Sequence, residues 1–320
     1  MKLTFADIQR LGQSLPSFSD PRAIATVWLQ SRPVQTYLDH YHINFSREFE
    51  TIQHRFGGIA SQGYRIAMHL WQQPEAKGTV FVLHGYTDNT GLMQHLIRFL
   101  LQQQWDVVCF DLPGHGLSSG KRATIDNFDT YRDVFFDVLQ HLDGKAIAPL
   151  RGIGQSTGGA ILLNYLCSYP GQTAIKQSLL LAPLVRSHGW AWQSWFLPFL
   201  DVFTSKIKRG FLGSSHDVGF LSFIEHHDPC QPDYLSVEWL KAMQAWVVKV
   251  LDLSTQWQPL TIIQGDKDTT VDWRYNVRKI QKVFPETHIK LIEGARHQLV
   301  NESDDYRAQV MALIGEWLTE

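Results

Sequence analysis

The stretch LRGIGQSTGGAILLNYLCSY, residues 150–169, places a glycine-rich turn between a short apolar run and a longer one. The turn contains Gly154-Gln155-Ser156-Thr157-Gly158, which fits the pattern G-x-S-x-G. The run before it predicts a buried strand, and the run after it predicts a helix. A serine on so sharp a turn has a strained backbone, and glycines two positions away relieve the crowding around it. We therefore predict that Ser156 is a nucleophile; the alternative is a turn whose serine only caps the helix.

Strand-like and helix-like segments alternate on both sides of this turn. Short apolar runs predict strands at 78–85, 105–114, 150–156, 178–185, 260–265 and 287–294. Residues 56–74 predict a hairpin ahead of them, with bends at Gly57, Gly58 and Gly63. Strands that alternate with helices form a mostly parallel sheet with helices on both faces. Together with the nucleophile turn, this order is typical of the α/β-hydrolase fold.

The alternation is interrupted once, and the interruption divides the chain. Residues 51–184 and 258–320 form the predicted core, residues 1–50 a helical extension before it, and residues 185–257 an inserted helical cap without strands. The most apolar part of the cap predicts a wall for an acyl chain. Its substrate-binding residues would be Trp190, Trp192, Trp195, Phe196 and Phe199. The alternative is that these side chains only pack the cap onto the core.

A serine nucleophile needs a base, and the base needs an acid that fixes its tautomer. In this fold the acid and then the histidine follow the serine along the chain, on loops after strands. His297 is the only histidine after the last predicted strand, so we predict that it is the base. Three aspartates share the earlier loop. Asp266 could form the turn and Asp272 could cap the next helix, so the residues alone leave the acid open between these two and Asp268.

The tetrahedral intermediate of acyl transfer carries a negative oxygen, which needs backbone N–H donors already aimed at it. The fold takes one donor from the residue after the nucleophile, here Thr157. It takes the other from the loop after an earlier strand, where HGYT at 84–87 makes Tyr86 the candidate. The alternative is that HGYT is only a tight turn, although a turn would also aim the N–H inward.

Together these segments resemble the monoacylglycerol lipase and lysophospholipase branch of the α/β-hydrolases, which includes serine-aminopeptidase-like members. The resemblance implies Asp268 as the acid, His297 as the base and Tyr86 as an oxyanion donor. Gln155 and Thr157 stand where these lipases usually have histidine and methionine, and Tyr86 replaces a small residue, so the resemblance leaves the substrate open. The matching stretches are HGYTDN at 84–89, DLPGHGLSSG at 111–120, GQSTGG at 154–159, GDKDTTVD at 265–272 and GARHQLVNE at 294–302.

The composition limits the kinds of partner and the cellular compartment that we expect for this protein. A net charge of −2 without a basic block gives no reason to expect nucleic acid, so the partner is a small molecule. Three cysteines far apart suit a reducing compartment. No leader-like start or run of about 18 apolar residues stands out, so we expect a cytoplasmic protein without a membrane span. Contact with a membrane surface and the oligomeric state are left open.

The predicted activity is hydrolysis of a lipid-like carboxylic ester, such as a monoacylglycerol or lysophospholipid, through an acyl-enzyme and without a cofactor. A peptidase, a thioesterase and a carbon–carbon bond hydrolase are alternatives on the same triad. A peptidase would need carboxylates near the site, and the cap offers Asp201, Asp217, Glu225 and Asp228. A ligand-binding protein without catalysis is a further alternative, although such proteins usually lose a triad member. His226-His227-Asp228 and nearby His216 do not have the spacing of a standard metal site, and His40-Tyr41-His42 is typical of solvated surface.

Overall fold

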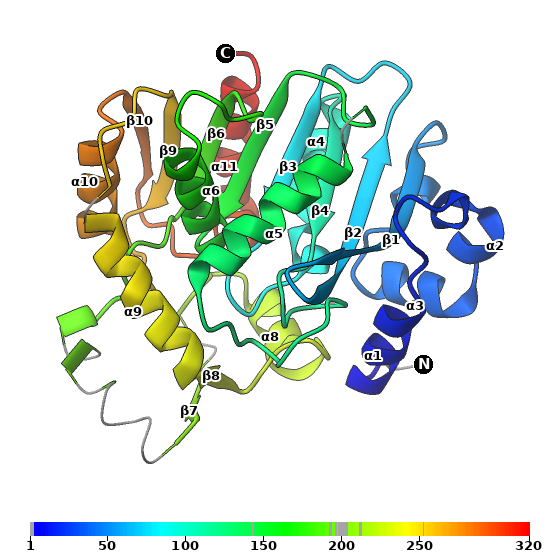
Figure 1. The fold of residues 1–320 in the computed structure, drawn as a ribbon, viewed down its shortest axis with the longest axis horizontal. Coiled ribbons are helices and arrows are strands. Elements are labelled where there is room, and N and C mark those ends of the chain that lie inside the picture. The colour runs from blue at the N-terminus through cyan, green and yellow to red at the C-terminus, as the bar shows by residue number, and fades with distance from the viewer. Residues whose placement is uncertain are drawn as a thin grey trace.

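A mostly parallel sheet of eight strands forms the centre of the protein, with strand order β1-β2-β4-β3-β5-β6-β9-β10 (Figure 1). The structure is a computed structural model and describes residues 3–142, 144–191, 194–195, 197, 204–210, 213–251 and 253–320. β2 runs antiparallel to both of its neighbours, and the remaining neighbouring pairs are parallel. The strands are β1 (Gln53–Ser61), β2 (Tyr64–Gln72), β3 (Thr79–Leu83), β4 (Asp106–Phe110), β5 (Leu150–Gln155), β6 (Gln177–Leu181), β9 (Leu260–Gly265) and β10 (Thr287–Ile292).

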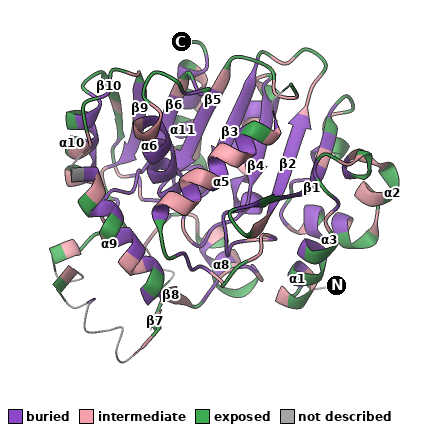
Figure 2. Cartoon of the chain, in the orientation of Figure 1, coloured by how far each residue is buried: buried purple, intermediate pink, exposed green. Residues whose placement is uncertain are grey.

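Helices cover both faces of this sheet, as the sequence predicts. α4 (Gln94–Gln102) and α11 (Asp304–Trp317) pack on one face, and their buried side chains join the same hydrophobic cluster as Val82 and Ile153. α5 (Phe128–His141), α6 (Thr157–Ser168) and α10 (Trp273–Val283) pack on the other, with Phe81 and Leu180. Figure 2 shows the result: the central strands of the sheet are buried, and the outer sides of the helices are exposed. Strands buried on both faces explain why their sequences are continuous apolar runs.

The predicted hairpin is formed by β1 and β2, but its glycines have different roles from those expected. Gln62 and Gly63 make the turn, with φ values of 49° and 79°. Gly57 and Gly58 lie inside β1 instead of at a bend. A Cβ at Gly57 would lie 2.8 Å from the carbonyl oxygen of Pro16, so the glycine permits a close approach of backbone. The bend prediction is wrong there because glycine serves close packing as well as turns.

The segment before the sheet consists of short helices packed against the core. Its elements are α1 (Phe5–Ser14), η1 (Pro21–Ile24), α2 (Thr26–Leu29), α3 (Arg32–His40) and η2 (Phe45–Arg47). Val34, Tyr37 and Leu38 of α3 are buried in the cluster that includes α4 and α11. We therefore treat residues 3–50 as part of one packed body with the sheet.

Between β6 and β9 the chain leaves the sheet and forms a cap. It contains α8 (Val218–His226) and α9 (Val237–Leu251), and also two short strands, β7 (Lys206–Lys208) and β8 (Tyr234–Ser236), which pair antiparallel. The expectation of a cap without strands is therefore wrong. Three-residue strands are too short for a periodic pattern to reveal them. In the part of the chain that the structure describes, no helix has the length and apolarity needed to cross a membrane.

Candidate active site

Ser156 lies on a sharp turn between β5, which ends at Gln155, and α6, which begins at Thr157. Its φ of 52° and ψ of −109° are rare for a residue with a side chain. Backbone hydrogen bonds to β6 and to the loop after it hold Ser156 in this strained conformation. The Ser156 N–H donates to the Leu181 carbonyl at 2.8 Å, and its own carbonyl accepts from the Leu184 N–H at 3.1 Å. Ser156 therefore has the strained geometry that the G-x-S-x-G pattern predicts.

The two glycines of the pattern are required by crowding at this turn. A Cβ at Gly154 would lie 2.5 Å from the carbonyl carbon of Gly158, and a Cβ at Gly158 would overlap the Leu83 carbonyl. Any larger residue at either position would push the turn away from the sheet. The turn thus holds Ser156 at the carboxyl end of the central strand β5.

Asp268 and His297 meet beside this turn. Asp268 follows β9, His297 follows β10, and the His297 Nδ1 lies 2.7 Å from the Asp268 Oδ2. The backbone N–H groups of Thr270 and Val271 donate to the other carboxylate oxygen at 2.8 and 3.1 Å. Asp268 therefore orients one ring nitrogen of His297 and leaves the other, Nε2, available as a base.

Polar side chains at the ends of β9 and β5 fix the same pair. The Gln264 side-chain amide donates to the Asp268 Oδ2 at 3.1 Å. The Gln155 side-chain amide donates to the His297 carbonyl at 2.9 Å and so ties the base loop to the nucleophile turn. Gln155 therefore stabilises the loop that carries His297, although the lipases that the sequence resembles usually have histidine at this position.

The other two aspartates of the loop have structural partners instead. Asp266 accepts from the Gly294 N–H at 2.7 Å and so joins the loops after β9 and β10. Asp272 caps α10 by accepting from the Tyr275 N–H at 3.3 Å, and it forms an ion pair with Arg186 at 2.6 Å. Of the three candidates, Asp268 is the one that contacts His297.

Electrostatics favour a charged form of this pair. Burial alone lowers the pKa of His297, but the Asp268 carboxylate, its hydrogen bond and nearby Asp88 together raise that pKa above its usual value. Burial alone raises the pKa of Asp268, but His297 and the backbone donors of Val271 and Thr270 bring it below its usual value. The arrangement therefore stabilises an imidazolium beside a carboxylate, which is what forms when the base accepts a proton.

The loop after β3 lies against the nucleophile. A Cβ at Gly85 would be 3.4 Å from the Ser156 Cβ, which places the next residue, Tyr86, at the site. The Tyr86 ring stacks on Trp239 of α9 with centroids 3.7 Å apart, and its hydroxyl donates to the Ala123 carbonyl at 2.8 Å. The Tyr86 side chain therefore points toward the cap and helps to hold its own backbone in place.

A cavity of about 450 Å³ opens onto the predicted nucleophile and base. Ser156, His297, Tyr86 and Thr157 all line it. Its apolar wall comes largely from the cap and from loops near the strand ends, through Leu184, Ile207, Leu235, Trp239, Leu240, Met243 and Val271. Polar groups gather elsewhere on its wall, among them Asp88, Arg209 and Gln298. The site can therefore accept a molecule with one apolar and one polar part.

The predicted aromatic wall is only partly within the described residues. Trp192, Phe196 and Phe199 lie outside them. Trp190 is half-buried against the core, and Trp195 is 64% exposed; neither is among the described residues that line the cavity. A role of this stretch in substrate binding stays a prediction. The wall contributed by Trp239, Leu240 and Met243 was not singled out from the sequence, although their spacing on one amphipathic helix was a usable signal.

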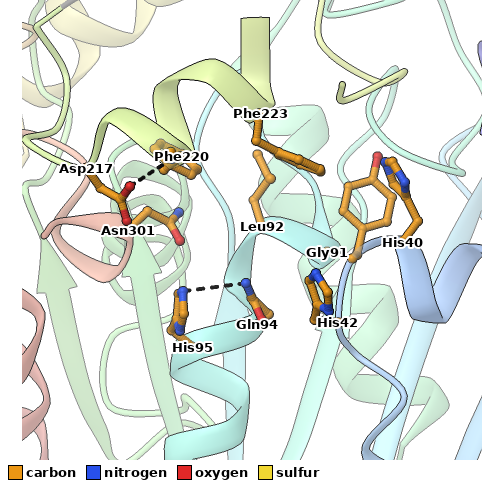
Figure 3. A pocket seen from close by; sticks show the side chains of 12 residues that line it. His40, His42, Gly91, Leu92, Gln94, His95, Asp217, Phe220, Phe223 and Asn301 are labelled. Atoms are coloured by element: carbon orange, nitrogen blue, oxygen red, sulfur yellow. Dashed lines mark hydrogen bonds between the residues drawn. The ribbon is translucent and has the colours of Figure 1, made fainter. Parts of the chain in front are cut away.

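A second cavity, of about 290 Å³, lies between the end of α3, the start of α4 and α8 (Figure 3). His40, His42, Leu92, His95 and Phe223 are among its lining residues. Burial, with nearby arginines, lowers the pKa of His95 to about 4, so this ring is neutral at physiological pH. Across the described part of the chain, no group of three or more His, Cys, Asp or Glu side chains is arranged to hold a metal ion.

Comparison with known proteins agrees with this geometry. Residues 74–304 match the model of the serine aminopeptidase S33 family. The chain belongs to this family. A monoacylglycerol lipase from Mycolicibacterium smegmatis is 24% identical over 267 residues, which cover 79% of this chain and 92% of the relative. The predictions of an α/β-hydrolase and of an ester hydrolase are thereby confirmed.

Solved structures show the same fold. A soluble variant of the Saccharomyces cerevisiae monoglyceride lipase, in complex with a substrate analogue, has a TM-score of 0.70 at 23% identity; the match covers 82% of this chain and 93% of that one. The Paleococcus ferrophilus monoacylglycerol lipase has a TM-score of 0.68 at 19% identity, over 79% and 98%. The family match begins at residue 74, so it leaves out the N-terminal segment.

Proposed function

We propose that this S33-family protein hydrolyses lipid-like carboxylic esters, such as monoacylglycerols or lysophospholipids. The observation that carries the proposal is the cavity, which holds Ser156 and His297 beneath an apolar wall from α9 and has polar groups elsewhere. An acyl chain suits the wall, and an alcohol bearing further hydroxyl or charged groups suits Asp88, Arg209 and Gln298. The names of the Mycolicibacterium and yeast relatives, both lipases of monoacylglycerols, support this substrate class.

In the proposed mechanism, the Ser156 Oγ attacks the acyl carbon while the His297 Nε2 takes the serine proton. Asp268 holds the tautomer of His297 and stabilises the imidazolium. The Tyr86 and Thr157 N–H groups bind the oxyanion. The intermediate collapses, the alcohol leaves with the proton from His297, and the acyl group stays on Ser156. Water then attacks the acyl-enzyme while His297 takes its proton; His297 returns this proton to the departing Ser156 Oγ, so that the carboxylic acid leaves and serine is regenerated.

A peptidase is the second candidate because Asp88 lines the cavity and could pair with a free amine. However, the Gln298 side-chain amide already donates to both oxygens of the Asp88 carboxylate, at 3.3 Å each. The predicted cap carboxylates give little support: Asp217 caps α8, and Asp228 is buried in a network and is not among the described residues that line the cavity. Asp201 lies outside the described residues. Esters are therefore the favoured class.

A substrate panel tests the proposal. Full-length protein is assayed on p-nitrophenyl esters of graded chain length, on monoacylglycerols and lysophospholipids, and on aminoacyl anilides. We expect kcat/KM to rise with chain length over short and medium esters, by up to about 0.8 kcal/mol per buried methylene. Anilides should be poor substrates. A preference for anilides, or no dependence on acyl length, would contradict the proposed substrate class.

We also propose a reducing compartment such as the cytoplasm. Cys109, Cys167 and Cys230 are unpaired, and two of them are buried, where a thiol behaves as a small apolar group. Burial raises the pKa of the Cys167 thiol to about 12, so it is not a reactive thiolate.

A further inference from the structure

Asp228 in the cap is a buried carboxylate that the proposed mechanism does not use. Its Oδ1 accepts a hydrogen bond from the Tyr41 hydroxyl at 2.6 Å and another from the Cys230 N–H at 2.8 Å. Its Oδ2 accepts from the side-chain amides of Asn89 and Gln231, both at 3.3 Å. A buried carboxylate with this many donors is fixed in place, because water cannot replace a donor that it loses.

These donors come from three separate parts of the chain. Tyr41 directly follows α3 in the N-terminal segment, Asn89 belongs to the loop after β3, and Gln231 belongs to the cap. The prediction of a solvated surface at His40-Tyr41-His42 is therefore wrong for Tyr41, which is buried. The sequence of so short a polar segment does not show which of its residues faces inward.

The network holds the loop of the proposed oxyanion donor at two points just after Tyr86, namely Thr87 and Asn89. The Gln231 amide donates to the Thr87 carbonyl at 3.0 Å as well as to Asp228. Asn89, two residues further on, is held by Asp228. Thr87 has a φ of 68°, a conformation that persists in a residue with a side chain only when its surroundings impose it. Asp228 and Gln231 are part of those surroundings.

We propose that Tyr41 is a positioning residue, which acts through Asp228 to hold the loop that carries the Tyr86 N–H. The N-terminal segment thus completes a site whose catalytic residues all lie within the family match at 74–304. This inference rests on the proposed function, since the position of the loop matters to the reaction only if the Tyr86 N–H binds the oxyanion. Oxyanion donors act through precise placement, so a small displacement of the loop is costly.

The test compares Tyr41→Phe with Tyr37→Phe. Both tyrosines are buried at the same end of the N-terminal segment, but the Tyr37 hydroxyl has no hydrogen-bond partner among the described residues. We expect Tyr41→Phe to lower kcat by about 10- to 100-fold with KM changed less than about twofold. The affinity of an alkyl boronic acid, which forms a tetrahedral adduct with a nucleophilic serine, should fall in parallel. Tyr37→Phe should match the wild type in both.

Gln231→Met provides a second variant if Tyr41→Phe folds poorly. It removes the donor to the Thr87 carbonyl without altering the N-terminal segment, and we expect the same loss of kcat and of boronic acid affinity. Unchanged kcat and boronic acid affinity in folded Tyr41→Phe, or in Gln231→Met, would overturn the inference. A change in melting temperature alone would show a merely structural network, which also overturns it. Wild-type protein that neither hydrolyses esters nor reacts with a fluorophosphonate would instead refute the proposed function.

Discussion

Three aspartates on one loop differ in role because their immediate contacts differ. Asp268 contacts His297, Asp266 holds a glycine N–H, and Asp272 caps a helix. We expect Asp268→Asn to lower kcat by about 10⁴-fold, because an amide favours the wrong tautomer of the base. Asp272→Asn should keep most activity, while Asp266→Asn should act through the loop and cost far less than Asp268→Asn. Steady-state kinetics of the three variants show which aspartate is the acid. An inactive Asp266→Asn beside an active Asp268→Asn would contradict the assignment of Asp268.

The pH dependence of the reaction should follow His297. The base works only when its imidazole is neutral, and its pKa is raised by Asp268 and Asp88 against the lowering effect of burial. We therefore expect kcat/KM to fall as the pH decreases, with a midpoint above the usual histidine value of about 6.5. Asp88→Asn should move this midpoint to lower pH, since it removes one of the carboxylates that raise the pKa. A wild-type midpoint clearly below 6.5 would contradict this electrostatic account.

The same pKa shifts both add stability, but the two contributions are lost in opposite directions of pH. The raised pKa of folded His297 adds stability below its unfolded pKa of about 6.5, and this is lost as the pH rises through the folded value. The lowered pKa of folded Asp268 adds stability above about pH 4, which is lost as the pH falls through the folded value. The pair therefore contributes most to the free energy of unfolding in mildly acidic solution.

At the scale of elements, α9 carries some side chains that line the cavity and others that pack only against the core. Trp239 stacks on Tyr86 and lines the cavity, whereas Trp246, two turns further on, is buried against Phe128. We expect Trp239→Ala to flatten the dependence of kcat/KM on acyl length, because it removes apolar contact area from the wall. Trp246→Ala should lower the melting temperature but keep the slope. Equal slopes in wild type and Trp239→Ala would remove α9 from the acyl site.

The elements that could be predicted from the sequence are those with a strong local signal. Continuous apolar runs revealed the parallel strands, and G-x-S-x-G revealed the turn at Ser156, because burial on both faces and backbone strain restrict the residues allowed there. β7 and β8 were missed because three residues carry no periodicity. The contact of Tyr41 with Asp228 spans 187 positions, and nothing local in the sequence indicates it.

On the scale of the whole molecule, the N-terminal segment is part of the stable core. Leu38 of α3 is 1% exposed and belongs to the hydrophobic cluster that includes α4 and α11. We expect Leu38→Ala to lower the free energy of unfolding by about 2–5 kcal/mol, measured by urea denaturation. Val27→Ala, at a residue 88% exposed in the same segment, should change it by less than about 0.5 kcal/mol. A mild effect of Leu38→Ala would show that the segment is loosely attached.

The central claim is that Ser156 is a nucleophile activated by His297 and Asp268. Full-length protein is treated with a fluorophosphonate, and peptide mass spectrometry locates the adduct. We predict one stoichiometric adduct on Ser156, much slower labelling of Asp268→Asn, and a folded Ser156→Ala variant that is unlabelled and has lost ester hydrolysis by about 10⁴-fold or more. An adduct on another residue, or ester hydrolysis at the wild-type rate by folded Ser156→Ala, would contradict the account.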